Sequence, residues 1–139
     1  MIDLDNHTNF EVETVIIENI KKSLTNKEIE LIVVNNDEIQ ELNKIHRNID
    51  KATDVLSFPL DFDMPNMPLG SIVISIDFVE LKAKEYNHSC NDEFTLLFIH
   101  GLLHLLGFDH EIDEGEQRIK EEELIKEFNL PNSLIVRNS

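Results

Sequence analysis

The sequence predicts an α+β fold in which a small mixed β-sheet is covered by helices. Strand-like and helical segments alternate through the first half of the 139 residues, and helical segments dominate the second half. One predicted helix, from Asp92 to about Gly107, is apolar on nearly every side, so we expect it to be the central, buried helix. We expect residues 1–139 to form a single domain, because neither a long linker nor an internal repeat divides them.

The first half is predicted to contain two helices and three strands. Asn9 and Asn36 are the expected N-caps, since an asparagine side chain accepts a hydrogen bond from an otherwise unpaired N–H of the first helical turn. The expected elements are a helix from Asn9 to about Ile20, strands over 28–35, 54–60 and 70–76, and a helix over 37–45. The segment 61–68, which contains two prolines, is predicted to be a loop.

The second half is predicted to be helical. Helices are expected from Asp77 to about Tyr86, from Asp92 to about Gly107, and from about Asp113 to Phe128. The last helix should bury the apolar residues Ile119, Leu124, Ile125 and Phe128. We interpret the acidic run 121–123 as its solvated face.

Composition and charge narrow the class of protein. Hydrophobic residues make up 41% and charged residues 29% of the chain, which is typical of a soluble globular protein. We expect no membrane association and no signal peptide, because no apolar stretch reaches bilayer length and the N-terminus is acidic. Cys90 is the only cysteine, so a cytoplasmic location is expected and an internal disulfide is excluded. The formal charge of −16 argues against a polyanionic partner, but Lys44, Arg47 and Lys51 form one locally basic segment.

Three histidines predict a metal site. His100 and His104 are four residues apart in the apolar helix, and this spacing places both imidazoles on one side of a helix. Gly107 can adopt a left-handed backbone conformation that ends the helix, and the resulting turn can return His110 toward the same point. Three histidines and an open coordination position are typical of catalytic zinc, so we expect one Zn²⁺ per chain. A zinc-activated water would then be available for hydrolysis.

The same run departs from the zinc-protease signature at one residue. Those proteases have a glutamate next to the first histidine, and it acts as the general base in peptide hydrolysis. Gly101 occupies this position here. Peptidase activity is therefore the less favoured interpretation.

Three segments together resemble the YbeY family of bacterial metal-dependent endoribonucleases. They are 100–110, which contains the histidines, 47–59, which begins at Arg47, and 69–75. The resemblance extends over nearly the whole chain. It implies a zincin-like fold, a zinc ion held by His100, His104 and His110, and a contribution of Arg47 to cleavage. It also implies action on single-stranded ribosomal RNA in rRNA maturation and ribosome quality control. Ribosomal or small-subunit proteins are candidate partners. The sequence leaves the oligomeric state open, with a monomer favoured.

The chain also departs from that family in three places. Ser71 stands where the family usually has an acid, Ala52 replaces a usual proline, and His46 occupies a position that is more often aromatic. We interpret His46 as a structural substitute for the aromatic ring and not as a fourth metal ligand.

Several other polar residues are weaker candidates for the site. Asp109 is adjacent to a predicted ligand, and it could orient an imidazole or cap the turn after Gly107. Thr53, Ser57 and His88 are candidate pocket-lining groups.

Arg47 is the predicted phosphate-binding residue, because a guanidinium group forms paired hydrogen bonds with phosphate oxygens. The alternative for Arg47 is a surface salt bridge to Asp50 or Asp54. The predicted function is a zinc-dependent endoribonuclease that hydrolyses RNA phosphodiesters, with either water or the RNA 2′-hydroxyl as the nucleophile. Two other functions remain open: a zinc hydrolase of another class, such as a peptidase or amidase, and a ribosome assembly factor with structural zinc.

Overall fold

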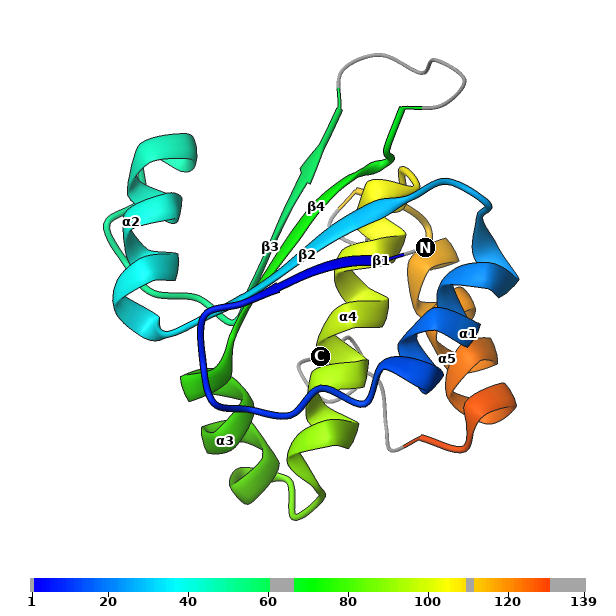
Figure 1. Cartoon of the computed structure of the whole chain (residues 1–139). Coiled ribbons are helices and arrows are strands. Elements are labelled where there is room, and N and C mark those ends of the chain that lie inside the picture. Colours follow the sequence, from blue (N-terminus) through cyan, green and yellow to red (C-terminus); the bar gives the residue numbers. More distant parts are fainter. Residues whose placement is uncertain (1, 61–66, 110–111, 131–139) are drawn as a thin grey trace.

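The computed structural model describes residues 2–60, 67–109 and 112–130 of the chain. In this part of the chain a four-stranded sheet and five helices form a mixed α/β fold (Figure 1). The elements in chain order are β1 (Ile2–Asn6), α1 (Thr14–Leu24), β2 (Ile29–Val34), α2 (Asn36–Arg47), β3 (Val55–Pro59), β4 (Gly70–Ser75), α3 (Ile76–Glu85), α4 (Cys90–Leu105) and α5 (Glu116–Phe128). None of the described helices has the length and apolar character that a bilayer span requires.

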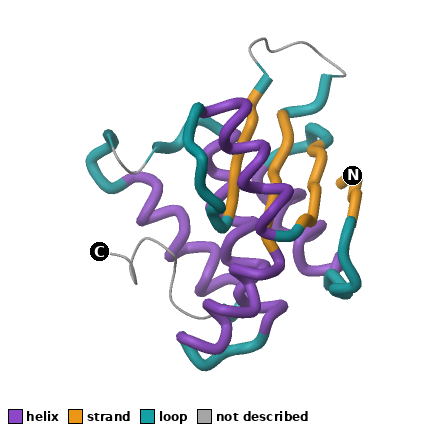
Figure 2. The backbone as a smooth tube through the Cα atoms, turned by 90° about the vertical axis from the view of Figure 1, so that its left-hand side faces the viewer, coloured by secondary structure: helices purple, strands orange, loops and turns teal. Residues whose placement is uncertain are grey.

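The sheet is mixed, as the sequence predicts, and its strand order is β1-β2-β4-β3. β1 pairs with β2 and β2 pairs with β4 in parallel, whereas β3 pairs with β4 antiparallel. α4 packs against β3 and β4 on one face of the sheet, where α1 and α5 lie beside it, and α2 covers the opposite face (Figures 1 and 2). The sheet therefore lies between two helical layers, and the layer that contains α4, α1 and α5 is the larger one.

Strand alternation separates two apolar clusters. Ile29, Leu31 and Val33 of β2 face the larger cluster, which also contains the apolar side chains of α4. Val34 faces the smaller cluster under α2, together with Ile39. Successive side chains of a strand point to opposite faces, so one face of β2 is fully buried and apolar, and the other is largely buried with Glu30 at its start. This burial explains why the β-branched run over 28–35 was recognisable as a strand.

α4 is the central helix of the larger layer, as predicted. Its side chains are buried almost continuously from Glu93 to Leu103, including Phe94, Phe98 and Leu102. The helix begins two residues before the predicted Asp92, because the side chain of Ser89 accepts a hydrogen bond from the Asp92 N–H at 3.0 Å. Gly107 has a φ of +100° in the turn that follows, which confirms the expected left-handed backbone.

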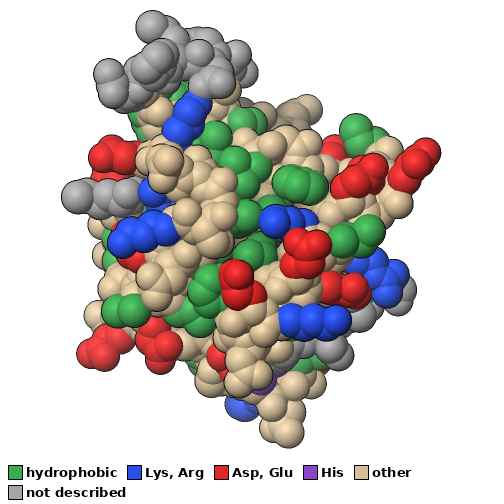
Figure 3. Space-filling view, turned by 90° about the vertical axis from the view of Figure 1, so that its right-hand side faces the viewer, with side chains coloured by type: hydrophobic (Ala, Val, Ile, Leu, Met, Phe, Trp, Pro, Cys, Tyr) green, Lys and Arg blue, Asp and Glu red, His purple; other side chains and the backbone are tan. Residues whose placement is uncertain are grey.

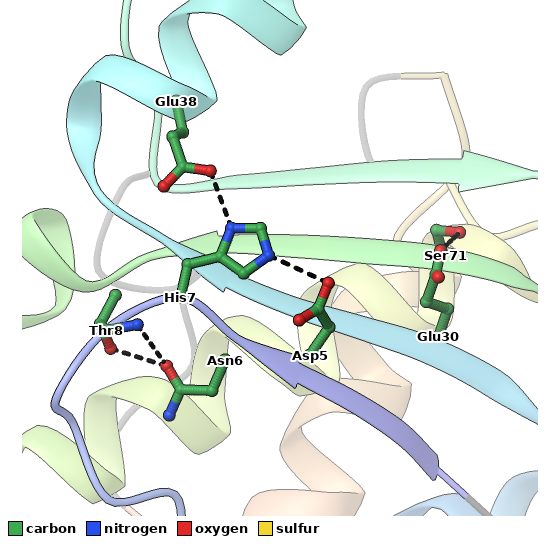
Figure 4. A network of polar contacts seen from close by, with 7 residues as sticks. All are labelled: Asp5, Asn6, His7, Thr8, Glu30, Glu38 and Ser71. Carbon is green, nitrogen blue, oxygen red and sulfur yellow. Dashed lines mark hydrogen bonds and ion pairs between the residues drawn. The ribbon is translucent and has the colours of Figure 1, made fainter.

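The prediction for the first helix was wrong at its start, and β1 was missed. Residues 6–10 are held in a turn by the Asn6 side chain, whose Oδ1 accepts hydrogen bonds from the Thr8 N–H at 2.9 Å and the Thr8 hydroxyl at 2.8 Å (Figure 4). Such local side-chain bonds compete with helix formation, so α1 begins only at Thr14. β1 is an edge strand whose Leu4 is 36% exposed, so its sequence has only a weak apolar pattern from which a strand could be predicted.

The last helix also differs from its prediction. α5 begins at Glu116, three residues later than expected, and Ile119 is 58% exposed. Leu124 is buried, as predicted, and the polar residues Gln117 and Glu121 are buried as well. On the side of the molecule that faces the viewer in Figure 3, acidic and basic side chains are interspersed with apolar ones. The buried face of α5 therefore includes two polar side chains, Gln117 and Glu121, that were not predicted to be buried.

Candidate metal and phosphate site

The structure brings two of the predicted metal ligands together at the C-terminal end of α4. The Nε2 atoms of His100 and His104 are 3.2 Å apart, and the two ring centroids are 4.8 Å apart with an interplanar angle of 73°. Both imidazoles thus direct the same ring nitrogen toward a common point. The spacing of four residues on one helix accounts for this arrangement.

The distance between these nitrogens suits a shared metal ion. Zinc binds imidazole nitrogen at roughly 2.0–2.1 Å, so two ligands at a tetrahedral angle should be about 3.3 Å apart. The observed 3.2 Å between the Nε2 atoms of His100 and His104 agrees with that value. The donor set, two imidazole nitrogens, is also one that zinc prefers.

The third predicted ligand, His110, lies outside the described residues. Among the residues that are described, no three histidine, cysteine, aspartate or glutamate side chains are grouped closely enough to hold one ion. The described part of the site therefore supplies two candidate ligands, His100 and His104.

Arg47 lies at the last position of α2 and borders the same cavity as the two histidines. The helix ends there because Asn48 adopts a left-handed conformation with a φ of +58°, and its N–H donates to the Lys44 carbonyl at 3.1 Å. The buried side chain of Asn43 then holds the following loop, since its Nδ2 donates to the Lys51 carbonyl at 3.0 Å. Hydrogen bonds on both sides of Arg47 thus determine where its backbone lies.

Arg47 does not form the ion pair with a neighbouring aspartate that was considered as its alternative role. No contact within 4.0 Å joins its guanidinium to Asp50 or Asp54, all three of which are described residues. The Asp50 carboxylate accepts from Gln40 Nε2 at 2.9 Å, and the Asp54 carboxylate accepts from the Val55 N–H at 2.8 Å. The Arg47 side chain is exposed at the edge of the cavity, where it can contact a ligand.

The cavity itself has a volume of about 470 Å³, within the range of small-ligand sites. Its lining combines the two histidines with polar side chains and one edge of β3: Arg47, Thr53, Asp54, Val55, Leu56, Ser57, Pro59, His100, His104 and Asp109. Thr53 and Ser57 therefore line the cavity, as predicted. The Ser57 hydroxyl donates to the Gly101 carbonyl at 2.9 Å, so this side chain ties β3 to α4.

Gly101 allows β3 and β4 to approach α4 closely beside the histidines. A Cβ atom at this position would lie 3.0 Å from Ile72 Cγ2 and 3.2 Å from both Ser57 Oγ and Val55 Cγ2. These distances are shorter than ordinary van der Waals contacts, so the neighbouring side chains would have to shift by a few tenths of an ångström to accept even a methyl group. The position that carries a glutamate in zinc proteases is therefore closely packed against β3 and β4 side chains.

One residue that contacts the candidate metal site, Glu121, was not predicted from the sequence. Glu121 is 1% exposed, and its Oε2 lies 2.8 Å from His100 Nδ1. The interpretation of 121–123 as a solvated face was thus wrong for Glu121, whereas Glu122 and Glu123 form exposed ion pairs with Arg118 and Lys120. A signal was present in the sequence, because Gln117, Glu121 and Leu124 recur at the spacing of one helical face.

The other candidate residues have identifiable contacts. The Ser71 hydroxyl donates to Glu30 Oε1 at 2.7 Å from the adjacent position of β2, so a carboxylate lies beside the position where the family usually has an acid (Figure 4). The His46 ring lies 5.0 Å from the Phe58 ring, as an aromatic substitute should. His88 does not line the cavity, because its Nε2 contacts Glu93 Oε1 at 2.7 Å near the opposite end of α4.

Fold and site together define a mixed α/β protein with paired imidazoles and an arginine at one cavity. Comparison with known proteins agrees with this class and identifies one family within it. The model of the family described as endoribonuclease YbeY matches residues 3–129. The chain belongs to this YbeY family.

The relatives match over nearly their full length. Proteins named endoribonuclease YbeY are 73% identical in Aliarcobacter butzleri, with 100% of both chains covered, and 64% identical in Sulfurimonas denitrificans, with 99% of both covered. The corresponding protein of Nautilia profundicola is 62% identical, again with 99% of both covered. A solution structure of a Thermotoga maritima protein is similar with a TM-score of 0.63 and 32% identity, over 92% of this chain and 89% of the other. The likeness thus includes both the sequence and the fold.

Proposed function

We propose that this chain is a zinc-dependent endoribonuclease that cleaves single-stranded regions of ribosomal RNA precursors in the cytoplasm. One zinc ion per monomer would be held by His100, His104 and His110 on a zincin-like scaffold. The observation that carries the proposal is the convergence of two Nε2 atoms, 3.2 Å apart, on a cavity that Arg47 borders. Membership of the YbeY family supports the choice of RNA as the substrate.

A bound zinc ion would supply Lewis-acid stabilisation of the phosphoryl oxygens and would lower the pKa of a water molecule. Arg47 would bind the scissile phosphate, because its planar guanidinium can donate two parallel hydrogen bonds to the non-bridging oxygens. The exposed Lys44 and Lys51 lie in the same segment and add positive charge near it. On a chain with a formal charge of −16, this segment would be the part that receives the RNA backbone.

The nucleophile can be identified from the RNA products. Attack by the 2′-hydroxyl on the adjacent phosphate forms a 2′,3′-cyclic phosphate and releases a 5′-hydroxyl end. Attack by water leaves a linear phosphate on one of the two product ends. Analysis of the ends by mass spectrometry separates the two routes.

Peptide hydrolysis is less favoured because of the packing around Gly101. Gly101 has no carboxylate to act as a base, and a Cβ there would already lie 3.0–3.2 Å from side chains of β3 and β4. A purely structural zinc is the remaining alternative, and a closed site would need a fourth protein ligand. Cys90 cannot serve as this ligand, since it begins α4 while His104 lies near the other end of that helix.

The test combines metal analysis with cleavage of a ribosomal RNA precursor by the purified chain. We expect one zinc per chain and cleavage by the wild type. His104→Ala should lose zinc and reduce cleavage by more than the roughly 100-fold that loss of an outer-shell partner costs. Arg47→Lys should keep the zinc but cleave about 10-fold to 100-fold more slowly, because one charged, bidentate contact is lost.

Two matched variants serve as controls. His7→Gln changes a histidine that contacts carboxylates away from the cavity, and Arg118→Lys changes an exposed arginine of α5. Both should retain wild-type zinc content and cleavage. Stoichiometric zinc without cleavage of RNA would favour the assembly-factor alternative, and cleavage of a peptide in place of RNA would favour the peptidase.

A further inference from the structure

α5 contributes a carboxylate to the side of His100 that faces away from His104. Glu121 Oε2 lies 2.8 Å from His100 Nδ1, while His100 Nε2 lies 3.2 Å from His104 Nε2. The two nitrogens of one ring thus have separate partners from different helices. We propose that Glu121 is a positioning residue that holds His100 as the tautomer protonated on Nδ1, so that Nε2 is available as a ligand; this rests on the proposed zinc site.

The chemistry of the contact determines the tautomer. An ionised carboxylate can only accept hydrogen bonds, so the Nδ1 of His100 must be the donor. In a neutral imidazole the other nitrogen then carries the lone pair. This lone pair belongs to Nε2, the atom that faces His104. The contact with Glu121 therefore specifies which atom of His100 can bind a metal.

Gln117 holds the carboxylate in place from the preceding turn of α5. Its Nε2 donates to Glu121 Oε2 at 3.2 Å, and it also lies 3.5 Å from His100 Nδ1. Gln117 is 0% exposed and Glu121 is 1% exposed. Burial limits the rotamers that either side chain can adopt, so the orientation of the His100 ring is determined before a metal binds.

The start of α5 is held independently of this contact. The Asp113 carboxylate accepts from the Gly115 N–H at 2.8 Å and from the Gln117 N–H at 3.1 Å. Leu124, one turn beyond Glu121, packs in the large apolar cluster. Because α5 has these other attachments, an isosteric change at Glu121 should alter the contact with His100 without releasing the helix.

The experiment compares Glu121→Gln with Glu122→Gln in the full-length chain. Zinc affinity is measured by competition with a chromophoric chelator, and the tautomer of His100 is measured by ¹⁵N NMR of the ring nitrogens in the zinc-free protein. Glu121→Gln should weaken zinc binding by about 10-fold to 100-fold, because the amide can accept from Nδ1 or donate to it. Glu122→Gln changes an exposed pair with Arg118, so zinc affinity should change by no more than about twofold.

The NMR measurement on the wild type tests the inference without any variant. We expect a protonated Nδ1 and an unprotonated Nε2 for His100 in the zinc-free chain, and a mixture of tautomers in Glu121→Gln. A wild-type His100 that is protonated on Nε2, or an unchanged zinc affinity in Glu121→Gln, would overturn the role of Glu121. Failure of the wild type to bind zinc would instead refute the proposed metal site, while the NMR result would still decide whether Glu121 sets the tautomer.

Discussion

Two buried histidine–glutamate pairs lie near the two ends of α4, and they differ in what surrounds the imidazole. At the N-terminal end, His88 Nε2 contacts Glu93 Oε1 at 2.7 Å; toward the C-terminal end, His100 Nδ1 contacts Glu121 Oε2 at 2.8 Å. Both glutamates are almost fully buried, with 0% and 2% of their side chains exposed. By distance and burial alone, the two pairs are nearly equivalent.

The surroundings of the two imidazoles separate their roles. The His88 ring is stacked with the Tyr86 ring, with centroids 6.4 Å apart, and it does not line the cavity that contains the candidate site. His100 faces a second imidazole across 3.2 Å at the wall of that cavity. A buried histidine–glutamate pair is therefore not a sign of function by itself. The second imidazole and the space beside it indicate a metal site.

The largest expected effect that tests this comparison comes from His88→Leu. The change removes the imidazole from the buried Glu93 carboxylate, so we expect a loss of about 3 kcal/mol in the free energy of unfolding, measured with urea. Zinc affinity should not change, because Glu93 and His104 are separated by about 16 Å along the helix axis. The double variant His88→Leu, Glu93→Leu should regain part of the lost stability, since no buried carboxylate remains. A fall in zinc affinity comparable to that of Glu121→Gln would show that the two pairs are not distinct.

An intermediate effect is expected at Gly101, beside the second pair. Gly101→Ala places a Cβ within 3.0–3.2 Å of β3 and β4 side chains, and overpacking of this kind costs about 1–3 kcal/mol in unfolding free energy. The added methyl also separates β3 from α4, so RNA cleavage should fall together with stability. Wild-type stability in a urea titration would mean that the sheet shifts freely, and that packing does not exclude a side chain at this position.

The smallest effect is expected from His7→Gln. His7 is a third histidine with carboxylate partners, and it is exposed. Its Nδ1 contacts Glu38 at 2.8 Å and its Nε2 contacts Asp5 at 2.9 Å, which links the end of β1 to the start of α2 (Figure 4). Two hydrogen bonds raise the pKa of His7 above its ordinary value of 6.5: the one to Glu38 has the larger effect and the one to Asp5 the smaller.

A raised pKa means that the folded chain binds the proton more tightly than the unfolded chain. The contribution of His7 is thus fully present below pH 6.5 and is lost as the pH rises through the pKa of the folded state. Wild type and His7→Gln should differ more in urea midpoint at pH 5.5 than at pH 9. Equal differences at both pH values would show that the pair contributes no proton-linked stability.

Local pattern was sufficient to predict much of the fold. Because β2 and β4 are mostly buried, their β-branched runs were recognisable, and the spacing of His100 and His104 implied that the two rings share one side of α4. β1 was not predicted because Leu4 is half-exposed and the strand is stabilised mainly by parallel pairing with a distant segment. The start of α1 was misplaced because the Asn6–Thr8 hydrogen bonds compete with the helix.

By itself, the sequence determined the helix that carries the paired imidazoles, the glycine that replaces the protease base and the basic segment around Arg47. These features depend on spacing and residue type along a short stretch of chain. Only the tertiary structure decided that Arg47 borders the cavity of His100 and His104, that Glu121 contacts His100, and that His88 pairs elsewhere. Helical periodicity states which residues share a face, but a partner 21 residues away is set by how α5 packs on α4.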